Sequence, residues 1–155
     1  MFKQSMLAAC AALGLSGCEV PVMIAAEAND GKWLTKGRSV FEIEFPAVMI
    51  VQVERVGEEV LTGTLLGHAN GTARYALTGP NWGACEGAYD KTGMSTFSCA
   101  NGLGFSVNLG EQRAKMSGHH IVSGAHRGRN FVSILGWGNE ASEPLLRGYL
   151  KGRAG

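Results

Sequence analysis

Apolar and polar residues alternate over short segments of this chain, which is the pattern of strands with one face in a core and the other in water. In the stretch SVFEIEF, residues 39–45, the odd-numbered positions from Phe41 on are apolar, their even-numbered neighbours are glutamates, and Pro46 ends the run. After the first twenty residues no long stretch keeps apolar residues at helical spacing. This pattern predicts an all-β chain.

Further strands are predicted about every ten residues, with turn residues between them. The segments are 48–56, 59–68, 72–78, 83–89, 94–100, 104–109, 113–122, 130–135 and 145–150. The 23 glycines lie between these short apolar runs, where turns and bulges need them. Such spacing indicates an antiparallel meander, and closure of a meander removes its exposed edges. We therefore expect a small barrel or sandwich of about eight to ten strands.

Two turns give pairing registers. In GHANGTAR, a two-residue turn at Asn70-Gly71 pairs residue 69 with Thr72, and it places Leu66 opposite Tyr75. In GACEGAYDKTGMSTFSCA, a three-residue loop that ends at Gly93 pairs Asp90 with Met94. Counting back from that pair places Cys85 directly opposite Cys99.

The next turn leaves two alternatives. A two-residue loop at Asn101-Gly102 turns Phe105 away from the face that carries Phe97. A three-residue loop over 101–103 keeps both rings on one apolar face and places Cys99 opposite Phe105. We favour the second loop because a one-residue shift moves every side chain to the other face.

The first residues have the order of an export signal, with Lys3 followed by an apolar stretch over 6–15 and then small residues. A membrane-spanning helix needs about 18 apolar residues, and Glu19 and Pro21 interrupt this run earlier. Ordinary cleavage after the A-x-A pattern at 26–28 is the alternative to the motif described next.

Leu15-Ser16-Gly17-Cys18 resembles the lipobox of bacterial lipoprotein precursors. The resemblance covers about the first 18 residues and implies that residues 1–17 are removed and that the Cys18 thiol carries the lipid. Two or more acyl chains give stable membrane attachment without a span. Residues 18–38 would then form a short tether, and 39–155 a single β domain. The resemblance implies an envelope protein facing the periplasm. The outer membrane is favoured because the residue after the cysteine is Glu19 and not the aspartate associated with inner-membrane retention in enteric bacteria.

Export also changes the cysteine and charge balance. Cys10 leaves with the signal and Cys18 takes the lipid, so Cys85 and Cys99 remain as a pair in an oxidising compartment and are predicted to form a disulfide. Loss of Lys3 leaves thirteen basic against thirteen acidic residues, and this neutrality argues against a nucleic-acid partner. Residues 111–155 nevertheless carry seven basic and three acidic side chains.

No pattern in the sequence supports catalysis, a metal or a cofactor. Histidines cluster at His119, His120 and His126, but the first two point to opposite faces of a strand. Only one of them can therefore join His126, and a metal site would need a further ligand from elsewhere in the chain. The Glu58-Glu59 pair fits a solvated turn better than paired acid–base groups.

Two tryptophans beside glycines, Trp82 and Trp137, are candidate contacts for a partner or ligand, with Arg127 and Arg129 as charged neighbours. Packing in the core is the competing interpretation of both indoles. The prediction is a membrane-anchored, non-catalytic binding or assembly module with an envelope protein or glycan as partner. A barrel that carries a small hydrophobic ligand is the alternative, and a metal-binding protein or enzyme that uses the histidines is a weaker one.

Replacement of Cys18 by Ser tests the anchor. We expect the variant to leave the membrane fraction, or to accumulate as uncleaved precursor, and to lose labelling by a fatty-acid probe, because no thiol remains to accept the lipid. Cys10→Ser is the control and should keep the label. Persistent labelling of the Cys18 variant, or a mature N-terminus at Asn29, would contradict the lipobox interpretation.

Overall fold

The computed structural model describes residues 42–68 and 70–153. The predicted signal, the lipid site Cys18 and the tether lie outside these residues. The described residues form eight antiparallel strands, a short 3-10 helix and an α-helix: β1 (Glu42–Val53), β2 (Gly57–His68), β3 (Ala73–Gly79), β4 (Gly83–Tyr89), β5 (Met94–Cys99), β6 (Gly104–Asn108), β7 (Gly118–His126), β8 (Arg129–Trp137), η2 (Gly138–Glu140) and α2 (Glu143–Arg153).

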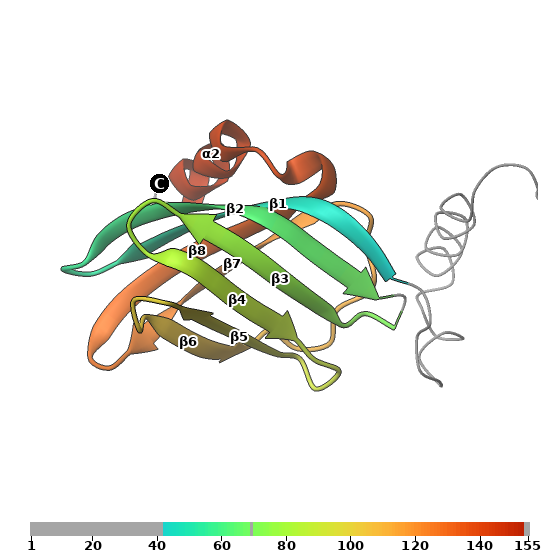
Figure 1. Cartoon of the computed structure of the whole chain (residues 1–155), viewed down its shortest axis with the longest axis horizontal. Helices are drawn as coiled ribbons and strands as arrows, with labels where there is room; N and C mark the ends of the chain where they lie inside the picture. The colour runs from blue at the N-terminus through green and yellow to red at the C-terminus, as the bar shows by residue number, and fades with distance from the viewer. Residues whose placement is uncertain (1–41, 69, 154–155) are drawn as a thin grey trace, which may run out of the picture.

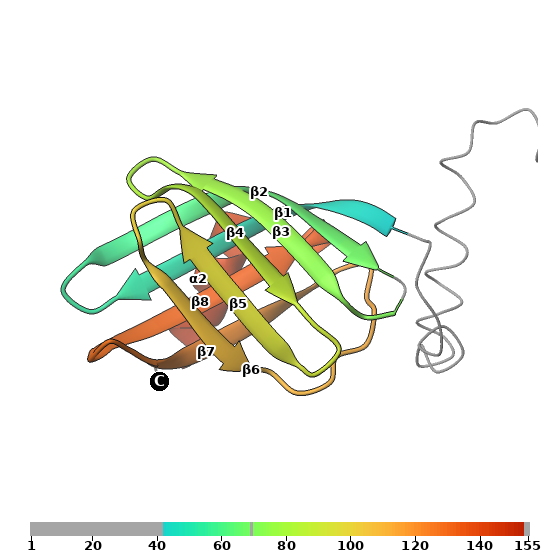
Figure 2. The ribbon, with the colours of Figure 1, turned by 60° about the horizontal axis from the view of Figure 1, so that its bottom comes forward.

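The strands form one sheet in the order β6-β5-β4-β3-β2-β1-β8-β7. The first strand pairs with the last one, so the sheet curls until β6 and β7 lie beside each other, as Figure 1 and Figure 2 show. Within the described residues no backbone ladder joins β6 to β7. The fold is a nearly closed all-β barrel, which confirms the predicted class, and we call the gap between β6 and β7 the seam.

The strand β1 is longer than expected, because it continues through Pro46 instead of ending there. Pro46 lies opposite Thr64 of β2, whereas the pairing with β8 begins one residue later, at Ala47. At Pro46 the strand is therefore an edge on the β8 side, which is where a sheet tolerates a residue without an N–H.

The predicted register of β2 and β3 is wrong by one residue. Leu65, not Leu66, lies opposite Tyr75, and both of these side chains are buried in the interior. The turn ends at Gly71, whose φ is 83°, and Asn70 accepts a hydrogen bond from the Thr72 N–H through its side chain. The His68 N–H donates to the Thr72 carbonyl at 2.9 Å, so His68 and Thr72 close the turn and the two-residue turn chosen from the Asn-Gly dipeptide does not form.

The predicted pairing of β4 with β5 is confirmed. The Asp90 N–H donates to the Met94 carbonyl oxygen at 3.0 Å, and Gly93 has a φ of 86°. Cys85 lies opposite Cys99, and the two sulfur atoms form a disulfide. This bond joins two neighbouring strands on the inner face of the barrel.

The loop between β5 and β6 also ends at a glycine, Gly102, with a φ of 83°. Phe97 therefore lies opposite Phe105, and the predicted pairing of Cys99 with Phe105 is wrong by two residues. A shift of two keeps the same face, so the expectation that Phe97 and Phe105 share the apolar side is correct.

Two predicted strands are wrong. The segment 113–122 is a strand only from Gly118 on, and residues 109–117 form a connection between β6 and β7. The segment 145–150 lies in the helix α2. Its signal is present in the sequence, because Leu146, Tyr149 and Leu150 have helical spacing and Pro144 suits a first helical turn.

Apolar side chains fill the barrel and also cover part of its outside. The interior cluster includes Phe45, Met49, Leu61, Leu77 and Phe97. On the outer face Ile50, Ile134 and Leu146 pack together with no exposed surface, because α2 lies across β1 and β8. The centres of β1 and β8 are thus buried on both faces.

Leu146→Ala tests how much α2 contributes to the barrel. We expect a loss of about 2–5 kcal/mol in the free energy of unfolding, because the truncation leaves a cavity against Ile50 and Ile134. The matched control is Leu145→Ala, since Leu145 is 39% exposed on the same helix and its truncation should change stability by less than about 0.5 kcal/mol. Urea denaturation measures both, and equal effects would contradict the packing role of α2.

Candidate binding site at the seam of the barrel

The two ends of the barrel differ in their connections. At one end, which we call the near end, β1 begins, and the β2–β3 and β4–β5 turns lie beside the 109–117 connection (Figure 1 and Figure 2). The Tyr89 hydroxyl donates to the Gly110 carbonyl there, and the Leu109 N–H donates to the Gly93 carbonyl at 2.7 Å. The β1–β2, β3–β4, β5–β6 and β7–β8 turns lie at the opposite, far end.

A pocket of about 210 Å³ opens at the far end, where the start of β6 and the tip of the β7–β8 hairpin face each other across the seam. We call it the seam pocket. It is lined by Val51, Val53, Trp82, Phe97, Gly102, Leu103, Gly104, Phe105, His126, Arg127, Arg129 and Phe131. Three of the four side chains predicted as partner or ligand contacts, Trp82, Arg127 and Arg129, line this one pocket.

Aromatic rings form the floor of the seam pocket. Phe105 of β6 stacks on Phe97 of β5 with ring centroids 4.8 Å apart, and on Phe131 of β8 with centroids 4.3 Å apart. The second contact crosses the seam, so side chains join the two edges of the sheet where no backbone ladder does. Trp82, which is 6% exposed, closes the floor from the β3–β4 loop.

The rim of the seam pocket is basic. His126, Arg127 and Arg129 are exposed at the tip of the β7–β8 hairpin, which turns tightly through Arg127 and Gly128 with φ values of 50° and 75°. Among residues 42–68 and 70–153, no carboxylate forms an ion pair with either arginine. The two guanidinium groups are therefore available to an anion.

Trp137, the fourth predicted contact, lies elsewhere. It lines a cavity of about 80 Å³ inside the near end, together with Tyr75, Ser95 and His120, and the 109–117 connection covers this cavity. The indole N–H of Trp137 donates to the Lys115 carbonyl at 3.1 Å. Burial raises the pKa of Tyr75 to about 12, and its hydroxyl donates to the Thr96 carbonyl. The two tryptophans thus belong to opposite ends of the barrel.

The three clustered histidines are separated by the fold. His119 points outward, where its ring contacts the Glu140 carboxylate and stacks on Tyr149 with centroids 4.1 Å apart. His120 points inward against Trp137, and burial lowers its pKa. His126 lies at the far end in the rim of the seam pocket. In the part of the chain that the structure describes, no three potential ligands from histidine, cysteine, aspartate and glutamate are close enough to hold a metal ion.

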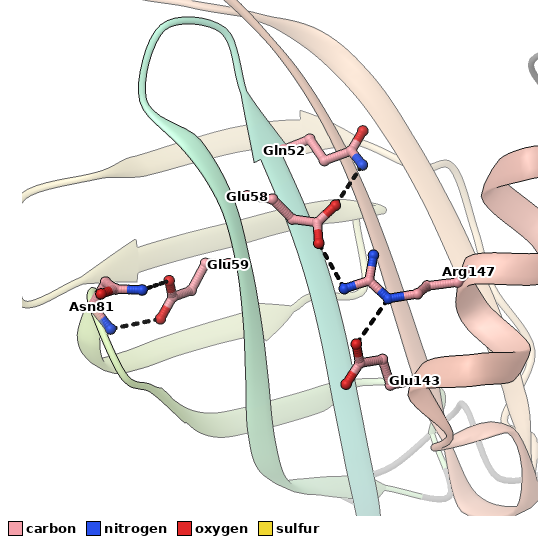
Figure 3. A network of polar contacts seen from close by, with 6 residues as sticks. All are labelled: Gln52, Glu58, Glu59, Asn81, Glu143 and Arg147. Carbon is pink, nitrogen blue, oxygen red and sulfur yellow. Dashed lines mark hydrogen bonds and ion pairs between the residues drawn. The ribbon is translucent and has the colours of Figure 1, made fainter.

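The expectation of a solvated Glu58-Glu59 pair is wrong for Glu59, which is buried, whereas Glu58 is exposed. Neighbouring residues of a strand point to opposite faces, and each of the two has its own partners (Figure 3). Glu58 accepts hydrogen bonds from Arg147 of α2 at 2.7 Å and from Gln52 at 2.7 Å, and the Arg147 contact holds the pKa of Glu58 below its ordinary value. Arg147 also binds Glu143, so this network joins α2 to the β1–β2 hairpin.

Glu59 is buried, with 2% of its surface exposed, and it anchors the β3–β4 loop. It accepts hydrogen bonds from the backbone and side-chain amides of Asn81, both at 2.8 Å, and from the Trp82 N–H at 3.4 Å. Burial raises the pKa of Glu59, but these N–H donors outweigh burial, so the pKa lies below its ordinary value. Glu59 thereby positions Trp82 beside the seam pocket, a role that the Glu-Glu sequence did not indicate.

Comparison of the chain with family models, curated protein sequences and solved structures finds no match. Within the described residues, the single α-helix is too short and too polar to cross a membrane.

Glu59→Gln tests the buried carboxylate. We expect the free energy of unfolding to fall by about 1–3 kcal/mol at neutral pH, because the side-chain NH2 group of glutamine would face N–H donors that now donate to a carboxylate oxygen. Since the folded-state pKa lies below the ordinary value of 4.5, the contribution of Glu59 is present above that pH and is lost as the pH falls through the lowered pKa.

The measurement is the free energy of unfolding of both proteins from neutral to acid pH. The two curves should converge at low pH. The variant must be compared with the parent protein because the pKa of Glu58 is also lowered, so protonation of Glu58 lowers the stability of both proteins as the pH falls. A constant difference at all pH values would contradict the role given to the ionised Glu59 side chain.

Proposed function

We propose that this chain is a lipid-anchored cell-envelope protein whose β-barrel domain binds a partner, without catalysing a reaction, through the seam pocket. The observation that carries the proposal is the combination of an apolar, aromatic floor with two exposed arginines that have no carboxylate partner among the described residues. Such a combination favours a partner with an apolar group next to an anionic one.

The volumes of the two pockets that reach into the barrel, one at its near end and one at the seam, favour a binding surface over a carrier of a hydrophobic ligand. Cavities that enclose drug-sized ligands have volumes of roughly 300 Å³ or more. The near-end cavity has about 80 Å³ and the seam pocket about 210 Å³. The disulfide, Phe97 and the rest of the interior cluster fill the space between them.

The position of the seam pocket suits a tethered protein. A tether that precedes the β domain would join the barrel at the near end, where β1 begins. The β1 strand has 12 residues and spans roughly 40 Å along its own direction, and Val51 and Val53 near its far end line the seam pocket. On this proposal the basic hairpin is presented to the periplasm and not to the membrane that holds the anchor.

Crosslinking in intact cells, with the protein tagged at its C-terminus, tests the proposal. We expect Arg127→Glu/Arg129→Glu to abolish capture of the partner without changing the melting temperature, because both side chains are exposed. Arg74→Glu/Lys91→Glu is the matched control, since it makes the same charge change at exposed positions outside the seam pocket. Unchanged capture by the first variant would contradict the proposal.

A further inference from the structure

We propose that the seam pocket takes an extended acidic peptide segment of a partner protein, with one aromatic or long aliphatic side chain in the pocket and a neighbouring carboxylate between Arg127 and Arg129. This inference rests on the proposed function, because it names the partner chemistry of the same site.

The charge of the rim selects for carboxylates. Two guanidinium groups flank Gly128 at the hairpin tip, and the imidazole of His126 lies in the same rim. Glu54 of the adjoining β1–β2 hairpin binds Arg55 at 3.5 Å and the Asn130 side chain at 3.0 Å, and it forms no ion pair with Arg127 or Arg129. Arginine forks match the geometry of a carboxylate, so an acidic side chain is the fitting occupant of this rim.

The floor selects for a single apolar side chain. Its side chains are those of Val51, Val53, Leu103 and the aromatic residues, which offer ring faces and methyl groups. A volume of about 210 Å³ is below that of sites for drug-sized molecules, but it can receive the side chain of one residue. A sugar would need several polar partners that this floor does not supply.

The backbone around the pocket favours an extended chain. The facing edges of β6 and β7 have no ladder partner within the described residues, and small exposed residues border the gap on both sides: Gly102 on one, Gly124 and Ala125 on the other. Residues 123–126 of β7 are exposed on both faces. Small, exposed edge residues let another backbone approach and form strand-type hydrogen bonds, as in peptide recognition by β-strand addition.

Binding of defined peptide pools to the full chain carrying Cys18→Ser tests this inference. The pools have equal length, a central phenylalanine or serine, and acidic, neutral or basic flanks. We expect the acidic phenylalanine pool to bind about tenfold or more tightly than the acidic serine pool and the neutral phenylalanine pool, and the preference to weaken with added salt. Hydrogen exchange should slow at the edges of β6 and β7 when this pool binds.

The matched variants separate the rim from the floor. Arg127→Asn/Arg129→Gln should reduce the affinity about tenfold, and asparagine tolerates the positive φ of position 127. Leu103→Ser should remove the preference for phenylalanine over serine while the preference for acidic flanks remains. Arg74→Gln/Lys91→Gln, with the same change in net charge, should bind like the parent protein.

Two results would overturn the inference. One is equal binding of acidic and neutral phenylalanine pools; the other is displacement of the acidic pool by vesicles of anionic phospholipid or by an acidic oligosaccharide at comparable concentration. If the arginines are required for capture in cells but no peptide pool binds, the proposed function stands and the peptide inference fails. If capture in cells is also independent of the arginines, both fail.

Discussion

The pairing of β1 with β8 is the interaction on which the rest of the barrel depends. It joins the first strand to the last strand and converts a meander into a barrel. The same two strands carry Met49 and Leu135 on the inside and Ile50 and Ile134 on the outside. Because α2 covers that outer patch, the closing ladder is buried on both faces, where its hydrogen bonds are protected from water.

The opposite side of the barrel is closed in a different way. Between β6 and β7 the described structure has no backbone ladder, and the stack of Phe97, Phe105 and Phe131 bridges the gap instead. Stacked side chains do not hold the two strand backbones in contact as a hydrogen-bonded ladder would, and the seam pocket lies in the gap that remains. Closure by ladder at β1–β8 and by rings at the seam thus accounts for both the stability of the barrel and the place of its candidate site.

Local patterns predicted the face of a residue better than its exact partner. Alternation placed Phe97 and Phe105 on the apolar side correctly, because a register error of two residues preserves the face. The β2–β3 register was wrong by one residue, because the Asn70-Gly71 dipeptide suits more than one turn and the burial of Leu65 and Tyr75 decides between them. The helix α2 was missed because a short stretch of leucines fits both periods until its partners on the sheet are known.

The sequence by itself determined the all-β class, the facing of Cys85 and Cys99, and the separation of His119 from His120, because each follows from the two-residue period of a strand. Only the tertiary structure decided that Trp82 joins Arg127 and Arg129 in one pocket while Trp137 lies at the other end. It also decided that Glu59 is buried and Glu58 is paired with α2. Curvature and closure of the sheet bring distant turns together, and these depend on the packing of the whole core, which no local period encodes.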